Sequence, residues 1–361
     1  MVSITIDARM IDASGIGVYL ENILEQIVSA YKVILLGDPD KLAAYQHTAQ
    51  IIPFFAPIYS IKEQIAFKNI IPECDIFWSP HYNVPLFSIK AKKRVATIHD
   101  VYHLAFSQEL GLLKRLYARM VMNVAVKLSS RIITVSEFSK KELLKYTKSE
   151  DNKITVIYNG VDHHVKINSF EDLKEKYKIP DKYILYVGNV KPHKNLRKLL
   201  EAYLLLDPSL YQKYKVVIVG QKHGFITGDL ALIKWIDNTP RLADNVIFTG
   251  FADHEDMDTL YYYASVFVFP SIYEGFGLPP LEAMANGCPV IVSNESCLPE
   301  ICGDAALYFN PFDEREISNK ISTVLKSRTL PTQLIERGIQ HASKFSWEKS
   351  GRIHIGLFNS L

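Results

Sequence analysis

The segment YEGFGLPPLEAMANGCPVIVS, residues 273–293, contains a turn, a short helix and a strand in succession. Two glycines and a double proline stand between Glu274 and Glu282. Pro280 suits the first turn of a helix, and an Asn-Gly pair at 286–287 is typical of a helix end. The apolar run that follows is typical of a strand buried on both faces, as strands of parallel sheets are. The segment therefore predicts an α/β fold.

The same alternation of strand and helix continues outward over the 361 residues. Six apolar runs in the first half and five in the second read as strands with helical periods between them. This pattern and length predict two Rossmann-like doubly wound domains facing a central cleft. We place them at residues 1–165 and 166–345, with the boundary in the polar segment 159–170.

Composition excludes several classes of protein. The net charge of +2 gives no electrostatic argument for a nucleic-acid partner. The start MVSITIDAR lacks the pattern of a signal peptide, and no apolar run approaches the length that spans a bilayer. The four cysteines show no metal-binding spacing, which favours free thiols in a reducing compartment. We therefore expect a cytoplasmic protein.

Ligands of open α/β sheets bind beyond the carboxyl ends of the strands, so the residues that follow each strand are the candidates. Gly15 and Gly17 follow the first strand, just before an expected helix. They belong either to a loop that contacts a ligand or to a flexible turn into the helix. Leu20 stands where a dinucleotide fingerprint has its third glycine, which disfavours an NAD-dependent oxidoreductase. His99 and Asp100 follow a later strand, and His99 is a candidate site residue or a structural histidine.

A basic cluster follows the first strand of the second half. Gly188 permits close approach to the backbone, and Lys191, His193 and Lys194 precede a helix. This arrangement indicates a phosphate site, and the alternative is a solvated basic loop.

The opening segment adds a second group of polar atoms. Gly275 and Gly277 can present backbone N–H groups near a helix N-terminus, which attracts anions. Glu274 and Glu282 flank this helix start, and a carboxylate without a cation partner can accept hydrogen bonds from hydroxyl groups. A ligand with both phosphate and polyol would satisfy these groups, whereas the alternative is a capped surface turn with two solvated acids.

These residues carry a family likeness. The chain resembles the retaining nucleotide-sugar glycosyltransferases of family 4, which have the GT-B fold, in the E-x7-E pattern from Glu274 to Glu282 and in the loop GNVKPHKN. The segments IHD, VSEFSK, YNGVD and FTGF also occur along the chain in the same order as in the family. The P-x-K-N form of the loop is most similar to the mannosyltransferase branch that uses GDP-mannose, with UDP-sugars left open.

The resemblance implies roles for individual residues. Glu274 would hold hydroxyls of the donor sugar and Glu282 those of the ribose. Lys194 would neutralise the leaving diphosphate, and His99 would contact the transferred sugar; His99, Lys194 and Glu274 are thus the expected catalytic residues. Glu274 is not expected to be a nucleophile. Further substrate contacts are implied for Gly15, Gly17, Gly188, Asn189, Phe251, Gly275, Phe276, Gly277 and Leu278.

The chain departs from the family at one point. Asn189 stands where many relatives carry arginine, and His193 stands where the P-R-K-N form of the loop has arginine. One cation that usually faces the phosphates is therefore missing, and Lys191 or Arg197 is a candidate to replace it.

We expect neither a metal nor a cofactor, the nucleotide-sugar being a substrate. Two D-x-D patterns occur, and metal-dependent transferases use such a pattern. Asp38 and Asp40 enclose a turn proline, and Asp256 and Asp258 lie in an expected helix, where residues i and i+2 do not share a face. Both patterns are read as structural.

One expected helix and a basic run bear on the acceptor. Residues 109–131 have helical periodicity with five basic residues and one acid, and the basic run 90–94 lies nearby in sequence. The helix is either a peripheral membrane face or an ordinary helix with a core stripe. Membrane docking would favour a lipid-linked saccharide acceptor in surface-polysaccharide or O-antigen assembly.

The last stretch, residues 346–361, resembles the family's terminal helix that packs back on the N-terminal domain. Two other functions stay open. One is a GT-B-type nucleotide-sugar epimerase, and the other is a non-catalytic protein that binds sugar nucleotides.

Overall fold

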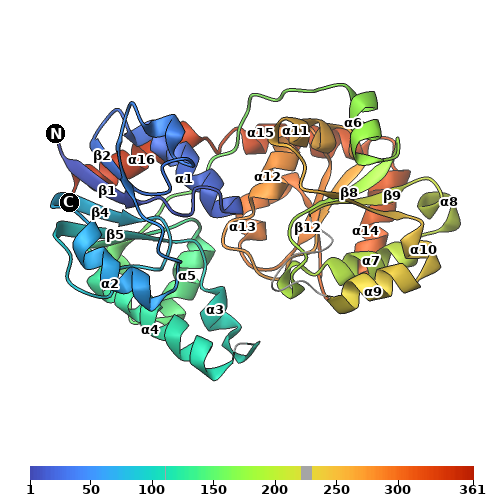
Figure 1. Cartoon of the computed structure of the whole chain (residues 1–361). Coiled ribbons are helices and arrows are strands. Elements are labelled where there is room, and N and C mark those ends of the chain that lie inside the picture. The colour runs from blue at the N-terminus through green and yellow to red at the C-terminus, as the bar shows by residue number, and fades with distance from the viewer. Residues whose placement is uncertain (110, 221–229) are drawn as a thin grey trace. The chain divides into compact units, whose positions relative to one another are not determined.

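The computed structural model describes residues 1–109, 111–220 and 230–361 and divides the chain into two compact units. The N unit contains Met1–Gly160 together with Ser346–Leu361, and the C unit contains Val161–Phe345 (Figure 1). The chain thus leaves the N unit once and returns to it with its last helix. The N unit therefore includes the C-terminal residues 346–361.

The N unit is built on a sheet of seven parallel strands in the order β3-β2-β1-β4-β5-β6-β7. Its strands are β1 (Ser3–Asp7), β2 (Lys32–Gly37), β3 (Gln50–Pro53), β4 (Cys74–Ser79), β5 (Ala91–Ile98), β6 (Arg131–Thr134) and β7 (Ile154–Val156). The strands bury mainly Ile, Leu and Val, which suit a sheet covered on both faces. Sequence analysis missed β3, because this edge strand is polar at its start and ends in a proline.

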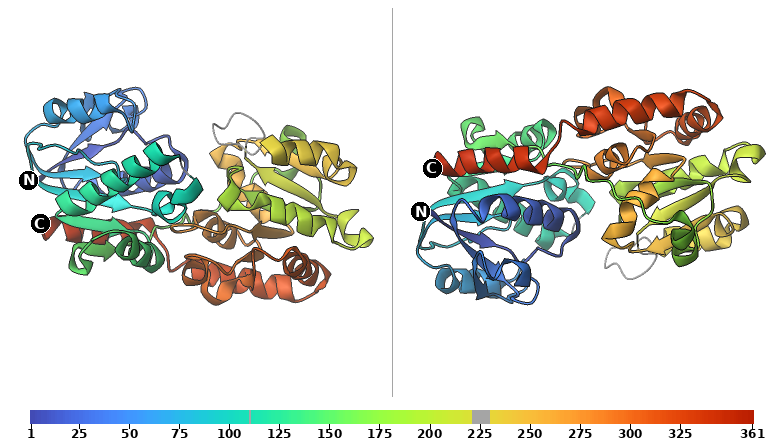
Figure 2. Two further views of the ribbon diagram at one scale, coloured as in Figure 1. Left: turned by 90° about the horizontal axis from the view of Figure 1, so that it is seen from below. Right: turned by 90° about the horizontal axis from the view of Figure 1, so that it is seen from above.

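Helices cover both faces of this sheet. They are α1 (Ser14–Ile27), α2 (Ile61–Ile70), α3 (Tyr102–Ala105), α4 (Leu112–Leu128), α5 (Glu137–Tyr146) and α16 (Trp347–Asn359), with short 3-10 turns at Ala43–Tyr45, Ser107–Glu109 and Asp151–Lys153. Helices α1 and α16 pack side by side on one face (Figure 2), where the Tyr19 hydroxyl lies 2.7 Å from His354 Nε2. Helices α2, α4 and α5 cover the opposite face (Figure 1).

The C unit contains a second parallel sheet of six strands in the order β10-β9-β8-β11-β12-β13. Its strands are β8 (Tyr183–Val187), β9 (Lys215–Val219), β10 (Val246–Gly250), β11 (Val266–Phe269), β12 (Val290–Ser293) and β13 (Leu307–Phe309). Sequence analysis did not predict β13, because three residues are too few to show a period.

The helices of the C unit also lie on two faces. They are α6 (Phe170–Tyr177), α7 (Leu196–Leu204), α8 (Pro208–Tyr211), α9 (Leu230–Asn238), α10 (Pro240–Ala243), α11 (His254–Tyr262), α12 (Leu278–Ala285), α13 (Leu298–Cys302), α14 (Glu314–Lys326) and α15 (Leu330–Ala342), with 3-10 turns η4 (Pro192–Lys194) and η5 (Gly303–Ala305). Helices α7, α9 and α14 share one buried apolar cluster with the sheet. Helix α12 packs against α15 and α11.

Both strand orders place a topological switch point near the middle of the sheet. In the N unit, β2 and β3 extend the sheet to one side of β1, and the strands from β4 onward extend it to the other side. In the C unit the same change of side occurs between the neighbours β8 and β11. The loops that follow the two strands at a switch point diverge to opposite faces, which leaves room for a ligand at the carboxyl edge. The two switch points are therefore where functional side chains are expected.

Candidate active site

An ion pair lies at the switch point of the C unit. Lys194 ends the turn η4, which follows β8, and Glu274 lies in the turn after β11. Lys194 Nζ lies 2.6 Å from Glu274 Oε1 and 2.8 Å from Oε2. Both side chains keep some exposure, 21% and 13%, so a ligand in solvent can reach them.

Backbone and amide hydrogen bonds hold these two loops together. The His193 carbonyl accepts from the Ile272 N–H at 2.8 Å. The Asn195 side chain donates to the carbonyls of Pro270 and Pro311, at 3.1 Å and 2.8 Å. Sequence analysis missed Asn195, although asparagine tolerates the left-handed conformation that it adopts here at φ 56°.

The ion pair changes the interpretation of Glu274. Without a cation partner this carboxylate was expected to bind hydroxyls, but Lys194 engages both of its oxygens. A diphosphate that drew Lys194 away would free the carboxylate for a hydroxyl donor. The Glu274 N–H donates to Ser296 Oγ at 3.2 Å, and sequence analysis had not singled out Ser296.

The helix after Glu274 offers few backbone donors. Gly277 is the N-cap of α12, and no side chain caps this helix start. The next residues are Leu278, Pro279 and Pro280, and the two prolines carry no N–H. The donors at this helix terminus are therefore the N–H groups of Gly277 and Leu278.

Glu282 has a hydrogen-bond partner of its own. Its Oε2 accepts from the Tyr261 hydroxyl of α11 at 2.8 Å. Burial raises the pKa of the Glu282 carboxyl and outweighs the opposing effects of Tyr261 and His254. Sequence analysis did not identify Tyr261, because nothing in the sequence brings α11 next to α12.

The remaining candidates of the C unit lie along the same edge of the sheet. The Gly188 N–H donates to the Val219 carbonyl at 3.0 Å, and Phe251 is 66% exposed after β10. Gly220, which sequence analysis missed, lies so close to Gly188 that a Cβ would stand 2.4 Å from the Gly188 carbonyl oxygen. The carbonyl of Asn189 accepts from the Tyr186 hydroxyl at 3.3 Å.

One candidate for the missing cation is already engaged. Arg197 Nε lies 3.0 Å from Glu201 Oε1, and its guanidinium lies 4.8 Å from the centre of the Trp235 ring. Lys191 stands at the start of η4 and is partly exposed. Lys191 is therefore the better placed of the two to face an anion.

His99 follows β5 in the N unit, and its ring is fixed by two contacts. Its Nε2 lies 2.8 Å from the Pro80 carbonyl oxygen, and the ring meets the Tyr19 ring edge-on at 4.8 Å. Burial lowers the pKa of His99 and outweighs the Pro80 bond and Asp100. A carbonyl only accepts hydrogen bonds, so Nε2 carries the proton and Nδ1 of the neutral ring is an acceptor.

The two glycines after β1 differ from the expectation. Helix α1 begins at Ser14, so Gly15 and Gly17 lie inside its first turns rather than before it. Gly15 is exposed with open space around it. Gly17 is buried, and a Cβ there would stand 2.2 Å from the Ile11 carbonyl oxygen. The close packing of the preceding loop on α1 therefore explains why position 17 is a glycine.

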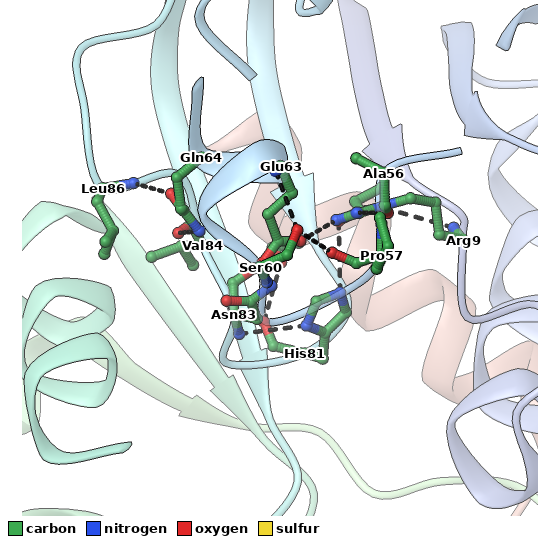
Figure 3. Close-up of polar contacts among 12 residues, drawn as sticks. Arg9, Ala56, Pro57, Ser60, Glu63, Gln64, His81, Asn83, Val84 and Leu86 are labelled. Carbon is green, nitrogen blue, oxygen red and sulfur yellow. Dashed lines mark hydrogen bonds and ion pairs between the residues drawn. The ribbon is translucent and has the colours of Figure 1, made fainter. Parts of the chain in front are cut away.

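The N unit also holds a buried charge network at its switch point that sequence analysis missed (Figure 3). Arg9 lies between the carboxylates of Asp7 and Glu63, at 2.6 Å and 2.8 Å from Nη2, and His81 Nε2 lies 3.4 Å from Asp7 Oδ2. Burial alone would raise the pKa of Asp7, but Arg9 and His81 hold it well below its ordinary value. Isolated charged residues in a sequence give no sign that the fold buries them together.

The D-x-D patterns have protein partners. Asp256 Oδ2 accepts from Lys176 Nζ at 2.6 Å and from the Tyr177 hydroxyl at 2.7 Å, and Asp258 accepts the Lys166 N–H at 3.0 Å. Within residues 1–109, 111–220 and 230–361, no group of three or more His, Cys, Asp or Glu side chains is arranged to hold a metal. The same ranges contain no helix that is long and apolar enough to cross a bilayer.

Two family models match the chain in succession. Residues 13–165 match the model described as glycosyltransferase family 4, and residues 169–341 match glycosyl transferases group 1. The O-antigen chain mannosyltransferase B of Escherichia coli is 31% identical over 277 residues, which are 76% of this chain and 71% of that relative.

Two further similarities concern a longer relative and a solved structure. The serotype-specific mannosyltransferase WbdA of Escherichia coli is 30% identical over 82% of this chain, and this chain spans only 38% of its length. Sucrose-phosphate synthase from Thermosynechococcus elongatus superposes with a TM-score of 0.81 at 21% identity, covering 100% of this chain and 99% of that structure.

Proposed function

Since this chain belongs to the family 4 glycosyltransferases and has their GT-B fold, we propose that it transfers mannose from GDP-mannose to a saccharide acceptor with retention of configuration. The observation that carries this proposal is the ion pair of Lys194 and Glu274 beside the N-terminus of α12. One place thus holds a cation, two backbone donors and a carboxylate, which are the groups that a sugar diphosphate requires.

Each group has a proposed role in the reaction. When the bond from the anomeric carbon to the diphosphate breaks, negative charge grows on the leaving oxygen. Lys194 and the N–H groups of Gly277 and Leu278 stabilise that charge electrostatically. Lys194 leaves Glu274 for the diphosphate, and Glu274 then accepts hydrogen bonds from hydroxyls of the sugar. Glu274 is a binding group rather than a nucleophile in this scheme.

The nucleoside and the transferred sugar contact other residues. Glu282 binds the ribose hydroxyls, and Phe251, exposed after β10, borders the base. His99 presents Nδ1 as an acceptor to a hydroxyl of the transferred sugar. Contacts along the diphosphate come from Gly188, Asn189, Gly275 and Phe276, and Gly15 is a further contact from the N unit.

The donor and the metal requirement are argued from separate observations. The names of the two Escherichia coli relatives support mannose, and the P-x-K-N loop favours GDP over UDP. We infer that no metal is needed, because Lys194 supplies the positive charge and the carboxylates of Asp38, Asp256 and Asp258 accept hydrogen bonds within the protein. EDTA should accordingly leave the rate unchanged.

The exposed surface of α4 supports a membrane partner. The side chains of α4 that pack into the core are those of Ala118, Val121, Met122, Ala125 and Val126. Five large apolar side chains of α4 remain exposed in addition, at Leu112, Leu113, Leu116, Met120 and Leu128. Lys114, Arg115 and Arg119 lie exposed among them.

This combination fits the surface of an anionic membrane. Ile61 and Ile65 of α2, 80% and 63% exposed, are on the same face of the sheet as α4 (Figure 1). A lipid-linked saccharide at the cytoplasmic face of the membrane is therefore the proposed acceptor. Such an enzyme would serve O-antigen or another surface polysaccharide, as the name of O-antigen chain mannosyltransferase B indicates for that protein.

A thermal-shift panel tests the donor first. GDP-mannose should raise the melting temperature more than UDP-glucose or ADP-glucose at equal concentration, because a ligand stabilises the folded state by mass action. Incubation with the preferred donor, with and without a mannose-terminated acceptor, then tests turnover. Epimerised donor without acceptor would indicate the epimerase, and binding without any product would indicate the non-catalytic protein; either result contradicts the proposal.

A further inference from the structure

We propose that the buried charge network around Arg9 is a positioning device for His99, which it controls through the turn formed by residues 80–83. Arg9 touches no substrate in this scheme. The inference rests on the role proposed above for His99, but its first experimental readout is the His99 ring itself and needs no substrate.

Arg9 links three segments of the N unit. Its Nε donates to Asp7 Oδ1 at 2.8 Å and its Nη2 to Asp7 Oδ2 at 2.6 Å, which makes a two-pronged bond to the end of β1. Nη2 also lies 2.8 Å from Glu63 Oε2, and Nη1 donates to the Ala56 carbonyl at 2.8 Å. All three nitrogens are used, so the single ammonium of a lysine could not replace the guanidinium.

The two carboxylates that Arg9 joins hold the 80–83 turn. Asp7 Oδ2 lies 3.4 Å from His81 Nε2. Glu63 Oε1 accepts from Asn83 Nδ2 at 2.8 Å (Figure 3). The Asn83 N–H donates to His81 Nδ1 at 3.2 Å. Nδ1 is therefore an acceptor, so the proton of the neutral His81 ring is on Nε2, the nitrogen that lies 3.4 Å from Asp7 Oδ2.

The strand side fixes the same turn. Ser79, the last residue of β4, shares its single Oγ–H between the carbonyls of His81 and Asn83, at 2.9 Å and 3.2 Å. The turn is thus anchored by β4 and by the two carboxylates that Arg9 holds. Asp7, Glu63, His81 and Asn83 all have side chains at most 1% exposed, so water does not substitute for these bonds.

The turn transmits its position to His99. Its first residue, Pro80, supplies the carbonyl that accepts from His99 Nε2 at 2.8 Å. This bond determines which ring nitrogen carries the proton and, together with the edge-on contact of Tyr19, fixes the rotation of the ring. If the Pro80 carbonyl moved, the edge-on contact with Tyr19 would not by itself dictate which ring nitrogen carries the proton.

Stability alone is a poor explanation for this network. Burying two carboxylates and one guanidinium costs desolvation energy, and apolar replacements of such groups are often as stable. What the charges add over apolar side chains is direction, because each hydrogen bond fixes the orientation of its partner. The network lies at the switch point between β1 and β4, where loop geometry matters most for a ligand.

Nitrogen-15 NMR of histidine-labelled protein tests the inference. His99 is assigned by the signals that vanish in His99→Gln. In the wild type we expect the proton on Nε2 at neutral pH, with well-separated shifts for the two nitrogens. In Arg9→Met the two shifts should converge, as both tautomers become populated. Lys92→Met, which breaks the 2.7 Å ion pair of Lys92 with Asp75 in the same unit, should leave His99 unchanged.

A milder variant covers the case in which Arg9→Met does not fold. Ser79→Ala removes the hydroxyl donor that the His81 and Asn83 carbonyls share and leaves no charge unpaired. It should shift the His99 signals in the same direction by a smaller amount. Wild-type His99 signals in every variant that folds would overturn the inference.

A double-mutant cycle adds a kinetic readout. Arg9→Met should lower kcat on the order of 10-fold to 100-fold, since small misplacements of a contact group have such effects. Nucleotide affinity should stay unchanged. In the His99→Gln background the same substitution should cause no further loss, and independent losses that multiply would contradict the inference. A wild type that binds nucleotide but transfers no sugar would refute the proposed function and leave the NMR result valid.

Discussion

The ammonium group of Lys194 lies 2.6 Å and 2.8 Å from the two carboxylate oxygens of Glu274, and the pair joins the loops after β8 and β11. Both residues are thereby held in place before any ligand arrives. Charged partners fixed in advance need little reorganisation when a diphosphate replaces the carboxylate. The pair is therefore the natural target for a first substitution.

Lys194→Ala should lower kcat by about 10²- to 10³-fold, the usual effect of removing one group that stabilises developing charge. Donor affinity should fall much less, because the backbone donors remain. Steady-state kinetics and calorimetric titration with the donor measure the two effects. The control is Lys198→Ala, four residues after Lys194. It breaks a 2.8 Å ion pair with Glu314 and should keep normal kinetics. Equal losses in affinity and turnover would indicate a binding role only.

Glu282→Gln should weaken nucleotide binding and alter the pH dependence of stability. The folded state raises the pKa of Glu282, so its contribution to stability is full below the ordinary pKa of 4.5 and is lost as the pH rises through the folded-state pKa. The neutral glutamine should therefore melt higher than wild type at pH 7.5 but not at pH 4. Glu295→Gln, at an exposed position, is the control. A wild-type melting profile in Glu282→Gln would contradict the burial argument.

The N unit should lose stability in acid through His354. Burial lowers its pKa to about 4, with Ser350 accepting from Nδ1 and Tyr19 bonded to Nε2. In the unfolded chain the His354 imidazole is protonated near its ordinary pKa of 6.5, whereas in the folded state it is protonated only near pH 4. The free energy of unfolding should therefore fall by roughly 3 kcal/mol between pH 6.5 and pH 4. The lowered pKa of His99 acts in the same direction.

Urea unfolding across that pH range measures this effect. His354→Gln should be less stable at pH 7 and flatter in its pH dependence, whereas His47→Gln at an exposed position should follow the wild type. The same slope in His354→Gln as in wild type would assign the acid sensitivity to other groups.

Gly15 and Gly17 form a matched pair on α1. Gly17→Ala should destabilise the protein by about 1–3 kcal/mol, because its Cβ would overlap the Ile11 carbonyl oxygen at 2.2 Å. Gly15→Ala has open space and should be neutral or stabilising by up to about 1 kcal/mol. Thermal unfolding compares the two. If Gly15→Ala folds normally but loses turnover, Gly15 contacts a substrate; if turnover is unchanged, its proposed contact is wrong.

The exposed face of α4 predicts membrane binding. Wild-type protein should sediment with vesicles that contain anionic lipid, less so at high salt. The double change Leu113→Ser and Leu116→Ser should reduce binding on the order of tenfold or more, because both side chains are largely exposed, at 83% and 56%, and would enter the lipid. Leu205→Ser, at a 52% exposed leucine of the C unit, is the control. Equal sedimentation of all three proteins would exclude α4 as the contact.

Much of the fold was predictable from local pattern. Apolar runs of four to eight residues separated by helical periods indicated parallel α/β sheets, and the spacing of Glu274, Glu282 and the GNVKPHKN loop indicated the family. The strands β3 and β13 escaped because they are short edge strands with weak periodicity. The start of α1 was placed too late, because glycine is a poor helix former and only packing on Ile11 shows why it is tolerated.

The sequence by itself determined the class of fold, the alternation of its longer strands and helices, and the residues that follow those longer strands, because these depend on periodicity along the chain. Only the tertiary structure decided partners. It paired Glu274 with Lys194, Glu282 with Tyr261, and Arg9 with Asp7 and Glu63. The last of these joins residues more than fifty positions apart, and no local pattern encodes which distant side chains a switch point brings together. The physical reason is that charge pairing is decided by burial and distance, which exist only after the strands have been ordered in the sheet.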